Sequence, residues 1–290
     1  MIILLGVIIV LGSVLGGFLM AGGNIGNLMH FSEWIIIGGA GLGSMVIMAP
    51  KKMLVTLFRQ MSQAFRGVPY NRSDFEELFK ALYELFVLGR RNGMVALEEH
   101  VLAPQNSAIF QRYPGFLRNK AALDFVCGGL KPIIDGRIKP DQLRHLMEVE
   151  LDRMEEDDHA VVMVLMRTSD AMPGFGIVAA VLGIVNTMQA IAGPIETIGK
   201  KVAAALVGTF LGIFIAYGFL APLAANMEFI NASRLAYLRC IAECVGSFAN
   251  GQAPLMAIEF GRRSLEADMC PGADELEEML KGVGTAGKKG

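Results

Sequence analysis

Four stretches of the chain are apolar over lengths typical of membrane helices. They are residues 2–21, 33–49, 172–193 and 202–224. A helix needs about 20 predominantly apolar residues to cross a bilayer, so the sequence predicts four transmembrane helices. The second stretch is short and rich in glycine. Glu33 and Trp34 lie at its start, however, and Lys51 and Lys52 follow its end, in the manner of interfacial anchors.

The long segment between the second and third stretches has the pattern of soluble helices. Ser73 and Glu76 match a capping box, and apolar residues follow at helical spacing as far as Gly93. Another helix is expected to open at Pro140, and its acidic run at 155–158 is interpreted as a solvated face. No strand-like alternation persists. The predicted fold is therefore all-α: an integral membrane protein with four transmembrane helices and a helical cytoplasmic domain.

Basic residues indicate how the chain crosses the membrane. Several follow the second span before any acid, whereas residues 22–32 hold no Lys or Arg. Because cytoplasmic loops are enriched in Lys and Arg, residues 51–170 are expected in the cytoplasm. An even number of spans then places both termini there too. Lys200 and Lys201, between the third and fourth spans, argue weakly for the opposite orientation.

The hydropathy pattern divides the chain into four segments. The predicted segments are transmembrane helices one and two in 1–50, a cytoplasmic helical domain in 51–170, transmembrane helices three and four in 171–227, and a cytoplasmic tail in 228–290. The Gly-rich end, 282–290, is expected to be disordered.

Composition narrows the possible functions. The 290 residues are 53% hydrophobic and only 19% charged, which excludes a purely soluble globular fold. A net charge of −2 gives no reason to expect a nucleic-acid partner. The sequence contains none of the common hydrolase, zinc-protease or phosphate-loop motifs. No enzymatic activity, metal or cofactor is therefore predicted.

The third and fourth spans contain no Asp, Glu, Lys, Arg or His. Ion pathways through membranes usually hold an ionisable side chain near mid-depth, so either the chain moves no ions or a partner supplies the carboxylate. The polar groups at depth are Asn186, Thr187, Thr209 and Tyr217. The Thr209 hydroxyl is able to line a pathway, although a membrane Thr commonly bonds to the carbonyl four residues earlier in its own helix.

Small residues and prolines mark the same two spans. Small residues recur four apart, as in the run Ala204, Gly208, Gly212 and Ala216. Such ridges let helices approach closely, either within one chain or between subunits. Pro222, near the end of the fourth span, leaves a carbonyl without its donor and is expected to kink the helix. Pro173 is interpreted as a helix start, where proline is tolerated.

The stretch ALVGTFLGIFIAYGFLAP, residues 205–222, resembles the signature of the MotA family of bacterial flagellar stator proteins. Three other motifs resemble the family in the same order along the chain. They are RRNGMVALE at 90–98, PGFGIVAAVLGIV at 173–185 and APLMAIEFGRRSL at 253–265. The resemblance also covers the first span and extends over nearly the whole chain.

The resemblance implies a flagellar motor stator subunit in the bacterial inner membrane. Several copies would surround a single-span partner of the MotB type, whose membrane aspartate binds the proton, and the complex would convert ion flow into torque. Thr209 would lie on the ion pathway, with Ala180 and Tyr217 as further candidates, and Pro173 and Pro222 would flank the part that changes shape. Sodium-driven relatives carry a second Thr where this chain has Ala180, so protons are favoured over sodium.

The family also implies a contact with the rotor, through a switch-complex protein of the FliG type. The charges expected to face that protein are Arg90 and Glu98, with Glu150 as a weaker candidate. Arg91 and Glu99 duplicate the sign of their neighbours, which leaves open which residue of each pair dominates. Exposed charges suit brief, salt-sensitive contacts, but ordinary surface charge is the alternative interpretation.

Two other functions remain open at this point. One is a proton-driven energiser of the ExbB or TolQ type, which usually has three spans and drives an envelope process. The other is a membrane scaffold that conducts no ions.

Overall fold

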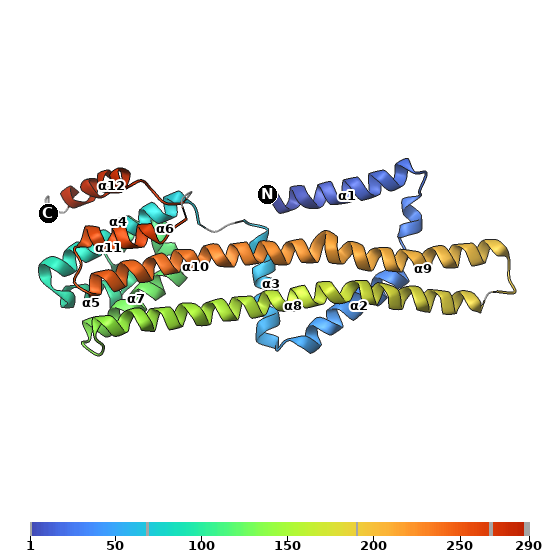
Figure 1. Cartoon of the computed structure of the whole chain (residues 1–290), viewed down its shortest axis with the longest axis horizontal. Helices are drawn as coiled ribbons and strands as arrows, with labels where there is room; N and C mark the ends of the chain where they lie inside the picture. The colour runs from blue at the N-terminus through green and yellow to red at the C-terminus, as the bar shows by residue number, and fades with distance from the viewer. Residues whose placement is uncertain (1, 68–69, 190, 267–268, 287–290) are drawn as a thin grey trace. The chain divides into compact units, whose positions relative to one another are not determined.

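The computed structural model describes residues 2–67, 70–189, 191–266 and 269–286 (Figure 1). Every regular element in these ranges is a helix, and none of them contains a strand. This confirms the predicted all-α fold. The chain divides by packing into two compact units, Met1–Gly67 with Asp157–Ile230, and Val68–Glu156 with Asn231–Gly290.

The first unit holds the apolar helices. Its elements are α1 (Ile2–Met20), the short 3-10 helix η1 (Ile25–Leu28), α2 (Phe31–Met48), α3 (Lys51–Ala64), the second part of α8 (Pro140–Met188), α9 (Ile195–Ile215), the π-helical segment η5 (Ala216–Leu220) and the start of α10 (Ala221–Ala249). Four helices are long and apolar enough to cross a membrane: α1, α2, α8 and the continuous run from Ile195 to Ala249. Each of the four predicted spans overlaps one of them, and the first three extend one to five residues beyond the helix end.

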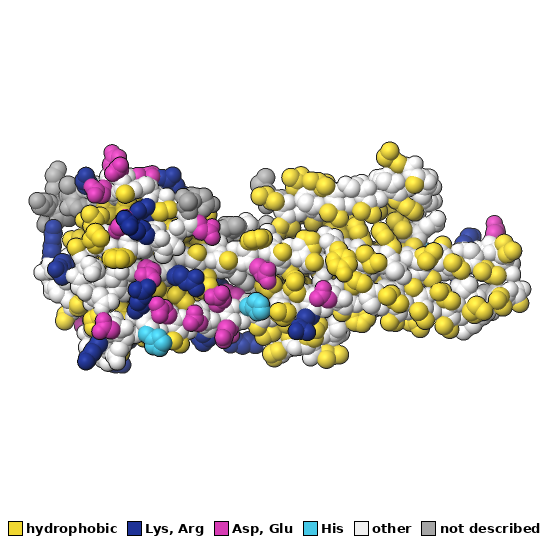
Figure 2. Space-filling view, in the orientation of Figure 1, with side chains coloured by type: hydrophobic (Ala, Val, Ile, Leu, Met, Phe, Trp, Pro, Cys, Tyr) yellow, Lys and Arg dark blue, Asp and Glu magenta, His cyan; other side chains and the backbone are white. Residues whose placement is uncertain are grey.

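Figure 2 shows apolar side chains over much of the visible face of these helices, as expected for helices that face lipid. Inside the unit, α2, α8 and α9 enclose a core that includes Ile37, Met172 and Leu211. A second core, with Leu57, Leu165 and Met227, lies between α3, α8 and α10. Residues 51–67 therefore pack with the membrane helices, although the sequence-based division assigns them to the cytoplasmic domain.

The second unit is built around α4 (Arg72–Asn92). Its other elements are η2 (Met94–Leu97), α5 (Glu98–Leu102), η3 (Pro104–Asn106), η4 (Phe110–Arg112), α6 (Pro114–Arg118), α7 (Lys120–Ile134), the first part of α8, the last part of α10, α11 (Pro254–Arg263) and α12 (Ala273–Ala286). Phe86 of α4 stacks on Phe248 of α10 with ring centroids 4.2 Å apart, and both rings are buried. Aromatic contacts of this kind fix α4 at the centre of the unit.

The ends of α4 show how the sequence sets a helix boundary. The N-cap is Asn71, whose side chain accepts from the backbone N–H of Asp74, while the Asp74 carboxylate accepts from the N–H of Asn71. The predicted capping box at Ser73 is therefore wrong by two residues. The predicted end is confirmed: Gly93 has φ +84°, a conformation that favours glycine.

Three sequence-based interpretations need correction. Pro173 does not start a helix, because α8 runs without interruption from Pro140 to Met188. The acidic run is not wholly solvated: Asp158 is buried and accepts a hydrogen bond of 2.8 Å from Gln60 Nε2 of α3. The Gly-rich end is helical up to Ala286 in α12, while residues 287–290 lie outside the described residues.

Candidate functional site

The backbones of α8 and α9 touch along the small-residue ridge. A Cβ atom added to Gly212 would lie only 2.6 Å from the carbonyl oxygen of Met172, and one added to Gly176 would lie 2.9 Å from that of Gly208. Distances this short require glycine at both places. The ridge on α9 therefore serves packing within one chain, one of the two uses that the sequence left open.

Glu33 of α2 reaches the same contact zone. Its side chain is 5% exposed, and its Oε2 atom has no hydrogen-bond partner among the described residues. This oxygen lies 2.8 Å from the position that a Cβ on Gly208 would occupy. Glu33 is therefore a buried side chain against α9, a packing role that its interpretation as an interfacial anchor did not include.

The structure brings Thr209 and Ala180 to this place. A Cβ on Gly208, the residue next to Thr209, would lie 3.5 Å from the backbone nitrogen of Ala180, and one on Gly176 would lie 3.2 Å from the Cα of Thr209. Three helices thus contribute to one site, with Glu33 from α2, Ala180 from α8 and Thr209 from α9. Buried polar atoms without a partner are rare in folded proteins, and each calls for an explanation.

The Thr209 hydroxyl is available for a partner. In contrast, Thr168 and Thr187 each donate to the carbonyl four residues earlier in their own helix, at 2.8 Å. Thr209 is half-buried and makes no such bond within the described part of the chain. The commonest structural use of a membrane Thr therefore does not account for Thr209.

Tyr217 is not brought to this site. It lies on η5, eight residues beyond Thr209, and its side chain is 62% exposed. Pro222 follows η5 at the second position of α10, and Pro173 lies within α8. Each proline leaves a carbonyl without its helical N–H donor, so both helices are locally weakened. The described residues contain no group of acids, histidines and cysteines that could hold a metal ion.

The charges expected to face the rotor lie at two consecutive helix ends in the second unit. Arg90 and Arg91 form the last turn of α4, and Glu98 and Glu99 the first turn of α5. All four are exposed, and none makes an ion pair with another described residue. Positive charge at a helix C-terminus and negative charge at an N-terminus also stabilise the helices themselves. Glu150 is half-buried on a different helix, α8.

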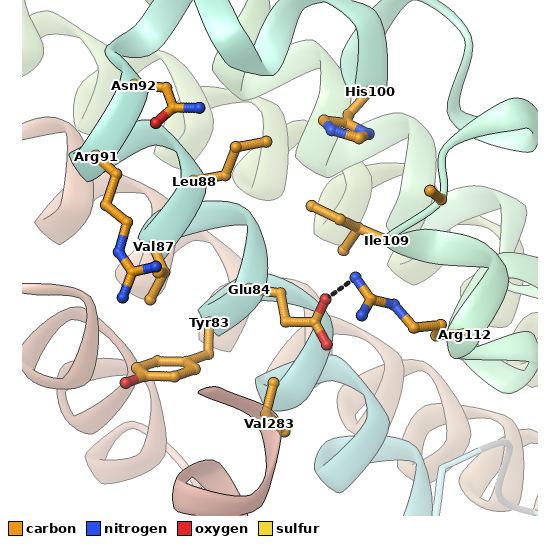
Figure 3. Close-up of a pocket in the computed structure, with 11 residues that line it drawn as sticks. Tyr83, Glu84, Val87, Leu88, Arg91, Asn92, His100, Ile109, Arg112 and Val283 are labelled. Atoms are coloured by element: carbon orange, nitrogen blue, oxygen red, sulfur yellow. Dashed lines mark ion pairs between the residues drawn. The ribbon is translucent and has the colours of Figure 1, made fainter. Parts of the chain in front are cut away.

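A cavity of about 460 Å³ opens beside these charges (Figure 3). Arg91 and Tyr83 of α4 lie along one wall, and His100 of α5 lies across from them. Glu84 is already paired, because it accepts from Arg112 and from the Tyr113 hydroxyl at 2.6 Å. Burial and the Glu84 carboxylate raise the pKa of Tyr113 well above its usual range. Arg91, in contrast, forms no ion pair with any other described residue, so its charge remains available on this wall.

Sequence reasoning missed Glu33, although a signal was present. The buried positions of α2 are Glu33, Ile37, Gly41 and Met45, a strict four-residue repeat. A residue in register with such a stripe faces the same neighbours as the stripe does. Because Glu33 lies at the start of an apolar run, it was interpreted as a residue at the membrane surface instead.

These features define a helical membrane protein with a buried polar site between its spans. Two family models match the sequence: Motility protein A N-terminal at residues 4–93 and the MotA/TolQ/ExbB proton channel family at residues 118–236. The chain is 37% identical to Motility protein A of Salmonella typhimurium over 98% of its length and 96% of that protein. It is 35% identical to Chemotaxis protein LafT of Vibrio parahaemolyticus, over 95% of this chain and 97% of the relative.

Solved structures share the fold. The chain superposes on a MotAB structure from C. jejuni with a TM-score of 0.75 at 21% identity, covering 92% of this chain and 96% of the other. It superposes on the flagellar MotAB stator complex from Bacillus subtilis with a TM-score of 0.73 at 24% identity, covering 95% and 98%. The chain belongs to the Motility protein A family. The N-terminal motility model favours this branch over the energisers that share the channel family.

Proposed function

We propose that the chain is a stator subunit of a bacterial flagellar motor and that it couples ion flow to torque on the rotor. The observation that carries the proposal is the 37% identity to Motility protein A over 98% of the chain. A single-span partner of the MotB type supplies the aspartate that the third and fourth spans lack. Several copies of the chain surround that partner.

The ion passes beside Thr209 in this proposal. Its hydroxyl makes no bond within its own helix, so it is able to bond to an ion or to a water molecule. Glu33 places a carboxylate oxygen without a partner at the same contact of α2, α8 and α9. Ala180 adds no oxygen ligand, which favours protons over sodium, because a bound sodium ion needs several oxygen ligands.

Torque is delivered in this proposal through Arg90, Arg91 and Glu98, with Glu150 as a further candidate, to a rotor protein of the FliG type. Exposed charges without partners attract a charged surface at long range and release it readily, as a stepping contact requires. The protein lies in the inner membrane with both termini in the cytoplasm. This orientation puts all of these charges on the rotor's side.

Deleting the gene tests the proposal. Cells without the protein should assemble full-length flagella, visible by electron microscopy, that do not rotate in liquid medium. Complementation with the wild-type gene should restore swimming. Normal swimming of a strain that lacks this gene and every other stator gene would overturn the proposal.

A further inference from the structure

A buried serine links α8, which carries Pro173, to the segment just before Pro222. Ser169 of α8 is 1% exposed, and its hydroxyl donates a hydrogen bond of 3.0 Å to the carbonyl oxygen of Ala216. The adjacent Thr168 donates to Val164 within its own helix, as hydroxyls in helices commonly do. Ser169 instead crosses to the next helix, so its bond serves contact between helices.

Ala216 is the first residue of the π-helical segment η5. Its carbonyl also accepts from the backbone N–H of Ala221, five residues later, which is the π pattern. In an α-helix the same carbonyl would accept from Leu220 instead. Single π turns are rare and mark functional sites more often than ordinary helix does. The Ser169 hydroxyl therefore bonds to the atom whose partner distinguishes the π form from the α form.

The position of Ser169 relative to the prolines gives this hydrogen bond a second structural role. Ser169 lies four residues before Pro173, so its own carbonyl is the one that the proline leaves without a donor. The π segment lies directly before Ala221 and Pro222. One hydrogen bond thus joins the weakened stretch of α8 to the weakened stretch before Pro222.

We propose that Ser169 is a positioning residue whose hydroxyl holds the π segment in place and ties the two proline-weakened stretches together. In this arrangement a change in the backbone conformation of α8 at Pro173 alters the bond from Ser169 to Ala216. That bond in turn affects whether η5 keeps π hydrogen bonding or adopts α hydrogen bonding. The consequence for torque rests on the proposed stator function, whereas the consequence for the backbone does not.

Hydrogen exchange measures the backbone consequence directly. The full chain, purified in detergent with its native single-span partner, is followed by mass spectrometry of peptides that cover 217–222. Ser169→Ala should speed exchange of the Ala221 amide about fivefold, the factor expected for loss of one neutral hydrogen bond. Ser169→Thr, which keeps the hydroxyl, should restore slow exchange. Thr168→Val, which removes the neighbouring intrahelical bond, should leave the peptide unchanged.

Unchanged exchange in Ser169→Ala, or an equal increase in Thr168→Val, would overturn the positioning role. Size-exclusion chromatography of each variant identifies any that misfolds, and Ser169→Cys then replaces Ser169→Ala, because it keeps the volume with a much weaker donor. Swimming speed tests the link to torque: it should fall in Ser169→Ala and recover in Ser169→Thr. Fast exchange with normal swimming would overturn that link. Normal swimming of the strain without stator genes would instead overturn the stator function and leave the exchange result standing.

Discussion

The carboxylate of Glu33 lies beside Gly208, in space that the side chain of any other residue at that position would enter. An added Cβ would lie 2.8 Å from Glu33 Oε2 and 3.1 Å from the Cβ of Ala179. The absence of one side chain on α9 thus creates the space in which a buried acid of α2 sits. Each of the two residues can be tested separately.

Gly208→Ala should destabilise the protein. The new methyl group displaces the carboxylate or separates α8 from α9, and overpacking of this kind costs about 1–3 kcal/mol. The midpoint of thermal unfolding in detergent should fall. Gly199→Ala on the same helix is the matched control, because an added Cβ there meets nothing within 4 Å. Equal midpoints for the two variants would contradict this account of the site.

Glu33→Gln should separate stability from function. A neutral amide costs less to bury than a carboxylate, so the unfolding midpoint should stay the same or rise. Ion flux through vesicles that hold the chain and its partner should fall several-fold, because the site loses its charge. The control is Glu196→Gln at the exposed start of α9. Undiminished flux in Glu33→Gln would remove Glu33 from the pathway.

Thr209→Val should reduce ion flux about fivefold, the cost of one lost hydrogen bond to the passing ion or water. Thr209→Ser, which keeps the hydroxyl, should retain most of the flux. Thr187→Val provides the comparison, since the Thr187 hydroxyl is bonded to Gly183 in its own helix. If the variants at 187 and 209 lose flux equally, the hydroxyl of Thr209 has no special role.

Reversing Arg90 and Arg91 together to Glu should abolish or strongly reduce swimming in soft agar. The positive charges of the two residues also stabilise the C-terminal end of α4, so the double variant should in addition lose about 1 kcal/mol of stability. Arg137→Glu with Lys139→Glu reverses two other exposed charges of the second unit and should leave swimming intact. Normal swimming with Glu at 90 and 91 would refute the assignment of the rotor contact.

The end of α11 should confer stability that depends on pH. Arg262 and Arg263 donate to the Glu259 carboxylate, and the bonds from Arg262 are the main reason that its pKa is lowered from 4.5 to about 2. A depressed pKa stabilises the folded state above the unfolded pKa, and this stability is lost as the pH falls through the folded one. Glu259→Gln should therefore lower the free energy of unfolding at pH 6 by about 2 kcal/mol, and the variant should unfold at a lower temperature than wild type.

The difference between wild type and Glu259→Gln should shrink between pH 4.5 and 2, measured by thermal unfolding. The exposed Glu266 makes no ion pair with a described residue, so Glu266→Gln should match wild type throughout. A difference that stays constant with pH would show that Glu259 acts by packing rather than by charge.

Hydropathy was enough to predict the membrane helices, because twenty apolar residues in a row have few other uses. It could not show that Glu33 is buried, since whether a helix end faces water or a neighbouring helix depends on packing between distant segments. The resemblance to the MotA family brought Ala180 and Thr209 into one list of candidates. Their closeness at Gly208 became visible only with the backbone contact of α8 and α9.

Helix boundaries were predicted less well where two local solutions compete. Asn71 and Ser73 are both good N-caps, and only the reciprocal bond between Asn71 and Asp74 decides between them. Pro173 likewise fits either a helix start or a helix interior. Tertiary packing against α9 keeps α8 continuous there, at the expense of one backbone hydrogen bond.

The contact between Gly176 and Gly212 limits which motions the membrane helices are able to make. With no side chains between the two backbones, neither helix can turn about its own axis without bringing the Cβ of a neighbouring residue into the other. The contact therefore hinders rotation of α8 against α9 and leaves translation and tilting of the pair as the easier motions. Bending is easiest where a backbone hydrogen bond is missing, at the carbonyls that Pro173 and Pro222 leave without a donor.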